Sequence, residues 1–134
     1  MSPPREASPE FIRAVLTSIN RTFGGPAPIQ FGKEDLLEML PSTVLGAVEE
    51  LIELLPNSSG ESLLHTKWGY DDEGTHPGLP TYDDLDLQDR HEVVELVAGP
   101  YNERFTIVRR DTLIEIDQAH SCGSGNVLFW LTAI

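Results

Sequence analysis

The sequence has a single cysteine, Cys122, and no hydrophobic run that approaches the length of a membrane span. One cysteine excludes an intramolecular disulfide, so a reducing, cytoplasmic compartment is the expected location. A transmembrane helix needs roughly twenty predominantly apolar residues, and the first residues lack the apolar stretch of a signal peptide. We therefore expect an intracellular protein that does not enter a membrane.

Positive charge is also scarce, and it is unevenly placed. The chain has nine basic and 22 acidic residues, which give a formal net charge of −13. Between Glu34 and Asp89 there are fourteen acidic residues and one basic residue, Lys67. This stretch, which we call the acidic segment, accounts for the whole net charge, because the small charges of the two flanking stretches cancel.

The charge pattern limits the partners that we expect. Binding to nucleic acid or to an anionic membrane surface depends on clustered lysine and arginine, which the sequence lacks. Solubility requires some net charge, but it does not require charge of one sign to be gathered into one segment. The pattern therefore favours a partner with a basic protein surface over direct binding to nucleic acid or a membrane.

Motifs for catalysis and cofactor binding are missing as well. The sequence contains no glycine-rich fingerprint for phosphates, no nucleophile elbow and no EF-hand spacing of carboxylates. We therefore expect a protein that is not an enzyme and that carries no cofactor.

The N-terminal part shows the apolar spacing of helices. After a lead over residues 1–7, which we expect to be flexible, Ser8 can cap a helix over residues 9–22. Further helices are predicted over residues 33–40 and from Ser42 to residue 55. The last of these presents a continuous apolar stripe, and three glutamates lie opposite it with no basic residue in the helix to pair with them.

The C-terminal part is rich in β-branched and aromatic residues, separated by glycine, proline and asparagine. A long acidic loop is predicted at about residues 70–87, because this stretch lacks periodicity and holds several glycines and prolines. For residues 91–98 a helix remains an alternative to a strand. The predicted strands cover residues 63–68, 91–98, 104–110, 113–118 and 127–133.

Helices followed by strands indicate an α+β fold over residues 8–134, with about three N-terminal helices on one face of an antiparallel sheet of four to five strands. The other face of the sheet is expected to stay exposed or to mediate a homodimer. The helical stripes, containing Phe11, Val15, Ile19, Val48, Leu51 and Leu55, are predicted to pack against Ile107, Ile114, Ile116, Leu128 and Trp130.

The favoured functional hypothesis is a non-enzymatic acidic binding protein, similar in charge and size to nuclease inhibitors, immunity proteins and antitoxins. Its carboxylates would imitate phosphate charge and steer a basic nuclease, toxin or nucleic-acid-binding protein into contact. Tyrosines beside the carboxylates would add cation–π contacts to lysine and arginine. The predicted partner-binding residues are Glu49, Glu50, Glu53, Tyr70, Asp71, Asp72, Glu73, Tyr82, Asp83, Asp84 and Asp86.

Two alternatives remain open. In the first, the chain is a small metalloprotein or metal-dependent enzyme that uses loop carboxylates and histidines, with His76, His91 and Glu95 as candidate ligands. His91 to Glu95 resembles a zincin motif in which a glutamate replaces the second histidine. Exposed polar residues explain the same pattern more simply. In the second, the chain is an accessory subunit whose uncovered sheet face pairs with a larger enzyme.

Overall fold

The computed structural model describes residues 5–23, 31–56, 64–70, 89–119 and 126–133. The described helices are α1 (Pro9–Phe23), α2 (Lys33–Met39) and α3 (Ser42–Ile52), and they come first in the chain. The described strands follow as β1 (Leu64–Tyr70), β2 (Arg90–Ala98), β3 (Glu103–Arg110), β4 (Ile114–Ala119) and β5 (Asn126–Ala133). The predicted α+β class is therefore confirmed, and residues 91–98 form a strand.

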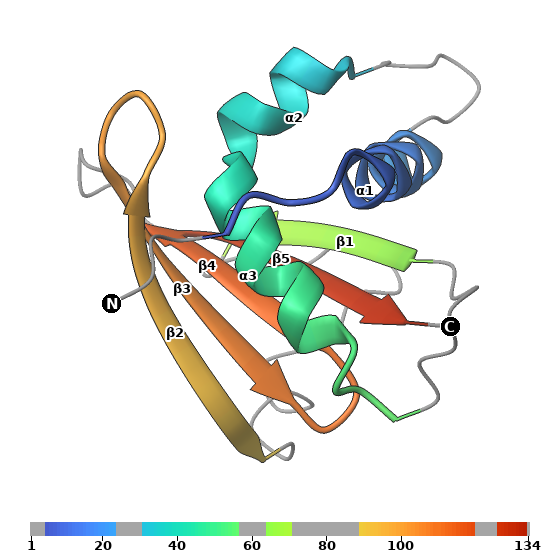
Figure 1. Cartoon of the computed structure of the whole chain (residues 1–134), viewed down its shortest axis with the longest axis vertical. Helices are drawn as coiled ribbons and strands as arrows, with labels where there is room; N and C mark the ends of the chain where they lie inside the picture. Colours follow the sequence, from blue (N-terminus) through green and yellow to red (C-terminus); the bar gives the residue numbers. More distant parts are fainter. Residues whose placement is uncertain (1–4, 24–30, 57–63, 71–88, 120–125, 134) are drawn as a thin grey trace.

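Within the described residues the strands form one five-stranded antiparallel sheet in the order β1-β5-β4-β3-β2. The helices gather on one face of this sheet (Figure 1). Although β1 and β2 follow one another in the sequence, they lie at opposite edges. Residues 71–88, which hold six acidic residues, therefore connect the two edges.

Local hydrogen bonds explain where the helices begin and end. The Ser8 hydroxyl accepts a hydrogen bond from the Phe11 backbone N–H at 3.2 Å, which confirms Ser8 as the cap of α1. Helix α3 ends at Ile52, earlier than predicted. Beyond it the backbone N–H groups of Leu54 and Leu55 bond to the carbonyls three residues before them, so the chain tightens into turns.

The main core lies between the helices and the inner face of the sheet, the face that the helices cover. Helix α1 packs chiefly on β1, and α3 packs on β3 with further contacts to β2 and β4. Cross-strand partners in the middle of the sheet, such as Ile107 and Ile116, point inward together. The strands supply Phe105, Ile107, Ile114, Ile116, Phe129 and Leu131 to this core, and the helices supply Phe11, Val15, Ile19, Leu45, Val48 and Leu51 among others.

The prediction for β5 was wrong in its sidedness. Leu128 and Trp130 do not face the helices; together with Leu113 they form a second buried cluster. Successive side chains of a strand point to opposite faces, and in β5 it is Phe129 and Leu131 that join the main core. We call the face that bears Leu128 and Trp130 the outer face of the sheet.

Replacing Ile116 with alanine tests the main core. The Ile116 side chain is fully buried, and its truncation should lower the free energy of unfolding by about 2–5 kcal/mol because it removes apolar contacts and leaves a cavity. The matched control is Leu54→Ala, since Leu54 is 53% exposed and should change stability by less than about 0.5 kcal/mol. Chemical denaturation measures both, and equal losses would contradict this core assignment.

Candidate functional site

Three of the predicted partner-binding carboxylates, Glu49, Glu50 and Glu53, are described, and all three belong to α3 or the residue that follows it. Tyr70 ends strand β1, but nothing is described of its side chain. The other predicted residues lie outside the described part of the chain: Asp71, Asp72, Glu73, Tyr82, Asp83, Asp84 and Asp86.

Glu49 was predicted to lie on an open acidic face, but the structure buries it. It is only 8% exposed, and its carboxylate is bound by the Arg5 guanidinium and the Ser8 hydroxyl. The backbone N–H of Ser8 donates a further hydrogen bond to it at 3.4 Å. A buried carboxylate needs such partners to offset the loss of hydration. Glu49 therefore holds the N-terminal residues on α3 and is not available to a partner.

A glycine on α3 allows this close approach. A Cβ atom built on Gly46 would lie 1.9 Å from the carbonyl oxygen of Arg5, so no larger residue fits there without displacing the backbone. The backbone N–H of Ala7 donates to the Ser42 carbonyl at 3.0 Å, and the Ala7 side chain is buried. Residues 5–7, which were predicted to belong to a flexible lead, thus pack against α3.

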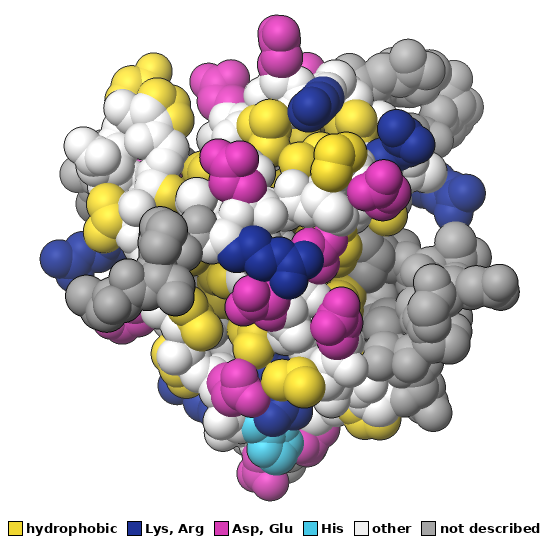
Figure 2. All heavy atoms as spheres, in the orientation of Figure 1, with side chains coloured by type: hydrophobic (Ala, Val, Ile, Leu, Met, Phe, Trp, Pro, Cys, Tyr) yellow, Lys and Arg dark blue, Asp and Glu magenta, His cyan; other side chains and the backbone are white. Residues whose placement is uncertain are grey.

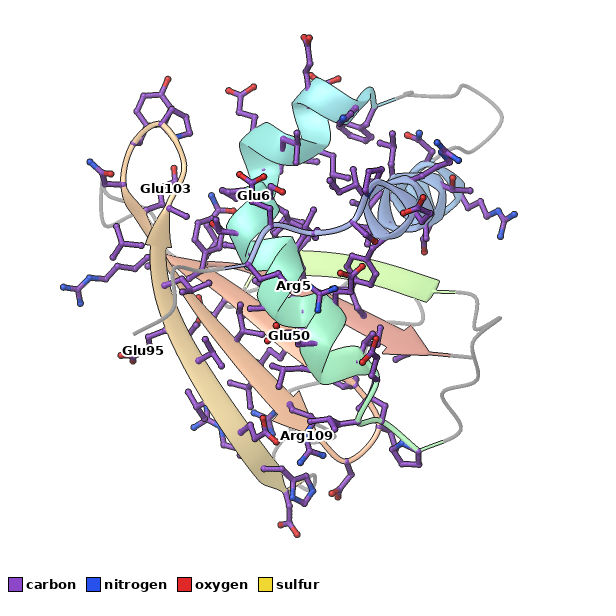
Figure 3. The ribbon with its side chains drawn as sticks, in the orientation of Figure 1. Arg5, Glu6, Glu50, Glu95, Glu103 and Arg109 are labelled. Carbon is purple, nitrogen blue, oxygen red and sulfur yellow. The ribbon has the colours of Figure 1, made fainter. Side chains whose placement is uncertain are left out.

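Glu50 and Glu53 are exposed, but Arg5 also reaches this surface. Its guanidinium lies 3.6 Å from the Glu50 carboxylate, and the two residues lie next to each other over α3 (Figure 3). On the visible helical face, carboxylates are interspersed with lysine and arginine side chains (Figure 2). Over residues 5–23 and 31–56 the chain has eight acidic and four basic residues. The described helical layer is therefore only moderately negative.

The described part of the sheet is close to neutral. Residues 64–70, 89–119 and 126–133 contain seven acidic and five basic residues. Arg109 pairs with Glu92 at 3.4 Å, and Arg110 pairs with Glu115 at 2.8 Å in a buried setting. The seven remaining acidic residues of the chain, with no basic residue among them, fall within residues 57–63 and 71–88.

The metal alternative loses its helical basis. His91 and Glu95 both lie on strand β2, where positions four residues apart are separated by about 13 Å; on a helix they would lie one turn apart. His91 is hydrogen-bonded to Asp111, and His76 lies outside the described residues. Among the residues that the structure describes, no three His, Cys, Asp or Glu side chains are grouped to hold a metal ion.

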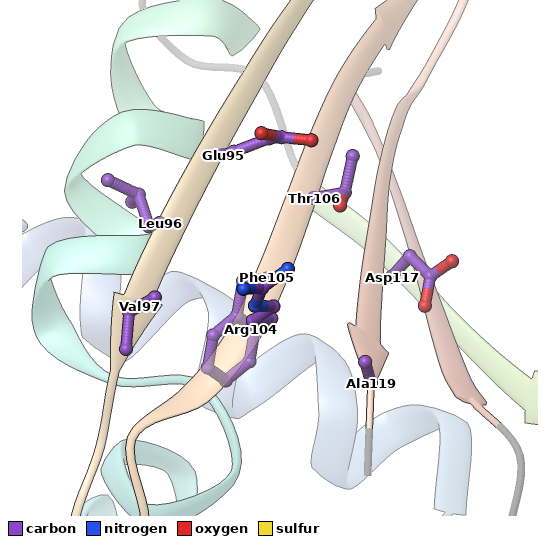
Figure 4. Close-up of a pocket in the computed structure, with 8 residues that line it drawn as sticks. All are labelled: Glu95, Leu96, Val97, Arg104, Phe105, Thr106, Asp117 and Ala119. Carbon is purple, nitrogen blue, oxygen red and sulfur yellow. The ribbon is translucent and has the colours of Figure 1, made fainter. Parts of the chain in front are cut away.

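The outer face carries a groove that was not predicted from the sequence. It has a volume of about 360 Å³ and crosses β2, β3 and β4 (Figure 4). Glu95, Thr106 and Asp117 lie side by side across it in register. The lining residues are Glu95, Leu96, Val97, Arg104, Phe105, Thr106, Asp117 and Ala119.

Arg104 and Glu95 are oppositely charged residues of this groove that come from neighbouring strands. Both side chains are exposed on the outer face, and neither has an ion pair within the described part of the chain. The alternation of residues along the predicted strands could have placed them together on one face, but their register across the sheet could not be read from the sequence.

Comparisons with known proteins add no relative. The chain matches no protein-family model, no curated protein and no solved structure at a significant level. None of the described helices combines the length and the apolar character needed to cross a bilayer.

The link between Ser8 and Glu49 can be tested by replacing Ser8 with alanine. The substitution removes the cap of α1 and one donor to the buried carboxylate, and it should lower the free energy of unfolding by about 1–2 kcal/mol. Thr17→Ala is the control, because Thr17 is exposed within the same helix. Equal stability of the two variants in urea would show that the link contributes nothing.

The contact between His91 and Asp111 predicts a pH effect. Hydrogen bonds from the His91 ring and from the Asp89 backbone N–H lower the pKa of Asp111 from its ordinary value of 3.8. A lowered carboxyl pKa stabilises the fold above the ordinary value, and this stabilisation is lost as the pH falls through the lowered pKa.

We therefore expect Asp111→Asn to be less stable than the wild type at neutral pH. The difference should shrink as the pH falls below 3.8. Unfolding curves recorded across this range measure it, with Asp89→Asn as a control that keeps the backbone donor. A deficit of Asp111→Asn that stays constant over the whole range would rule out the assigned cause.

Proposed function

We propose that the protein is a non-enzymatic acidic binding protein that docks a negative surface on a basic protein partner, in the manner of an inhibitor, immunity protein or antitoxin. The observation that supports this proposal is the distribution of charge. More than half of the net charge of −13 comes from residues 57–63 and 71–88, which contain seven acidic residues and no basic one.

The described ion pairs sharpen this argument. Arg5, Arg109 and Arg110 each pair with a carboxylate that lies near them in the fold. These arginines are paired with carboxylates of the same chain that lie outside residues 57–63 and 71–88. Glu49 leaves the set of candidate binding residues because its paired carboxylate is also buried, whereas Glu50 and Glu53 remain in it because they are exposed.

Charge of this kind acts mainly on the rate and specificity of association. A concentrated negative surface attracts a basic partner over a distance of about 10 Å at moderate salt and orients it before contact. Short-range contacts then hold the complex, and aromatic residues such as Tyr82 are suited to packing against arginine side chains. A partner that acts on nucleic acid would present the required cationic surface.

The proposal is tested by measuring affinity for a panel of purified small nucleases and toxins with basic isoelectric points. At least one should bind, and its dissociation constant should rise at least tenfold between about 50 mM and about 300 mM salt. Absence of binding across the panel at low salt, or an affinity that salt does not change, would contradict the proposal.

Matched charge reversals locate the surface on the chain. Asp71→Lys with Asp84→Lys should weaken binding of that probe by about tenfold or more. Glu6→Lys with Glu10→Lys changes the net charge by the same amount but lies in the N-terminal part, and it should have a several-fold smaller effect. Equal losses would mean that only the total charge matters, and that no particular surface is used.

A further inference from the structure

Strand β2 is an open edge of the sheet. It lies last in the strand order, so within the described residues only β3 pairs with it. Val93 and Val97 are 53% and 62% exposed and lie on the same face of this nine-residue strand. A long exposed edge with apolar side chains is a ready template for pairing with another strand.

The two faces of β2 differ in chemistry. On the outer face, Val93 and Val97 flank Glu95, and on the inner face Val94, Leu96 and Ala98 pack partly against the main core. We propose that β2 pairs with β2 of a second copy of this chain, antiparallel and about a two-fold axis at Glu95, so that one sheet continues through a homodimer. A two-fold interface of this kind is self-complementary.

The sequence of β2 selects this register. Opposite residues of an antiparallel pair point to the same face, so the axis must pass through a residue position. With the axis at Glu95, Val93 lies opposite the partner's Val97, and Val94 lies opposite the partner's Leu96. An axis at Val94 would place Val93 opposite a glutamate, and an axis at Leu96 would do the same to Val97. Only the axis at Glu95 matches every apolar side chain of Val93–Val97 with another.

The charged residues on the outer face fit the same arrangement. The axis brings two Glu95 carboxylates together, which alone would repel. Arg104 is the direct partner of Val97 on β3, and so it is a diagonal neighbour of Glu95 on the same face (Figure 4). Arg104 has no ion pair within the described residues. In the dimer one Arg104 from each copy flanks the carboxylate pair and balances its charge.

Polar residues confine the pairing to the middle of β2. Arg90, His91 and Glu92 occupy its first positions, and the register with β3 is irregular between Arg90 and Glu92. The turn at Gly99 ends the strand at the other side, where Gly99 adopts a positive φ of 86°. Charged and irregular strand ends discourage pairing, so the available template is Val93 to Val97.

Salt separates this inference from the proposed function. Two chains that each carry −13 repel one another, so screening by salt should strengthen the homodimer. Binding of a basic partner should weaken under the same change. Either conclusion can therefore fail without the other.

The first experiment is sedimentation equilibrium of the whole chain over a range of concentrations. We expect a species of twice the monomer mass of 14.8 kDa, whose dissociation constant falls as salt is raised. Val93→Lys should weaken this dimer at least tenfold. Leu54→Lys, at a position with the same exposed fraction of 53%, should not. A monomer at all concentrations and salt levels would overturn the proposal.

The second experiment tests the register and the charges. In a background of Cys122→Ser, a mixture of Val93→Cys and Val97→Cys chains should form a disulfide-linked heterodimer, whereas Val93→Cys alone should not crosslink. Glu95→Lys combined with Arg104→Glu should dimerise better than Arg104→Glu alone, because the double substitution restores opposite charges at positions 95 and 104. Crosslinking of Val93→Cys alone, or no crosslinking in the mixture, would overturn the axis at Glu95.

Discussion

The burial of one sheet face under the helices determines what the rest of the molecule can present. Strand residues alternate between the two faces, so placing Phe105, Ile107 and Ile116 against the helices commits their neighbours to the other side. Arg104 and Thr106 are thereby fixed on the outer face, beside Glu95 of β2. Within the described residues β2 is an edge strand, which α3 contacts and with which only β3 pairs.

The packing of the chain also determines which carboxylates are paired with basic residues. The N-terminal residues reach α3 through Arg5 and Ser8, and they bind the carboxylate of Glu49. This contact removes one carboxylate from the surface and places a guanidinium beside another, Glu50. The strands balance much of their own charge through local pairs. Of the net charge of −13, residues 57–63 and 71–88 of the sequence contribute seven acidic residues and no basic one.

The sequence was a good guide to local structure, because helices and strands follow from spacing that acts over a few residues. The apolar stripes of α1 and α3, the cap at Ser8 and the turn before β3 are all of this kind. Contacts between distant residues could not be predicted in the same way. Glu49 was expected on an open face because its partner, Arg5, lies 44 positions away in the chain.

The prediction of which side chains of β5 face the helices was wrong for a related reason. Residues 127–131 are apolar on both faces, so alternation alone does not say which of Leu128 and Phe129 meets the helices. The pairing of Phe129 with Ile116 decides it. The groove on the outer face was missed because its row of Glu95, Thr106 and Asp117 exists only once three strands are in register.

The two proposals assign separate surfaces to the protein: a negative one for a basic partner and an apolar strand edge for a second copy. Hydrogen–deuterium exchange of the whole chain, alone at two concentrations and then with a bound basic protein, examines both in one measurement. Amides of β2 should gain protection as the concentration of the chain rises, and amides within residues 57–88 should gain it only when the basic protein is added. The assignment of surfaces would be contradicted if the exchange rates in β2 did not change with concentration and the basic protein protected α1 and α2 instead.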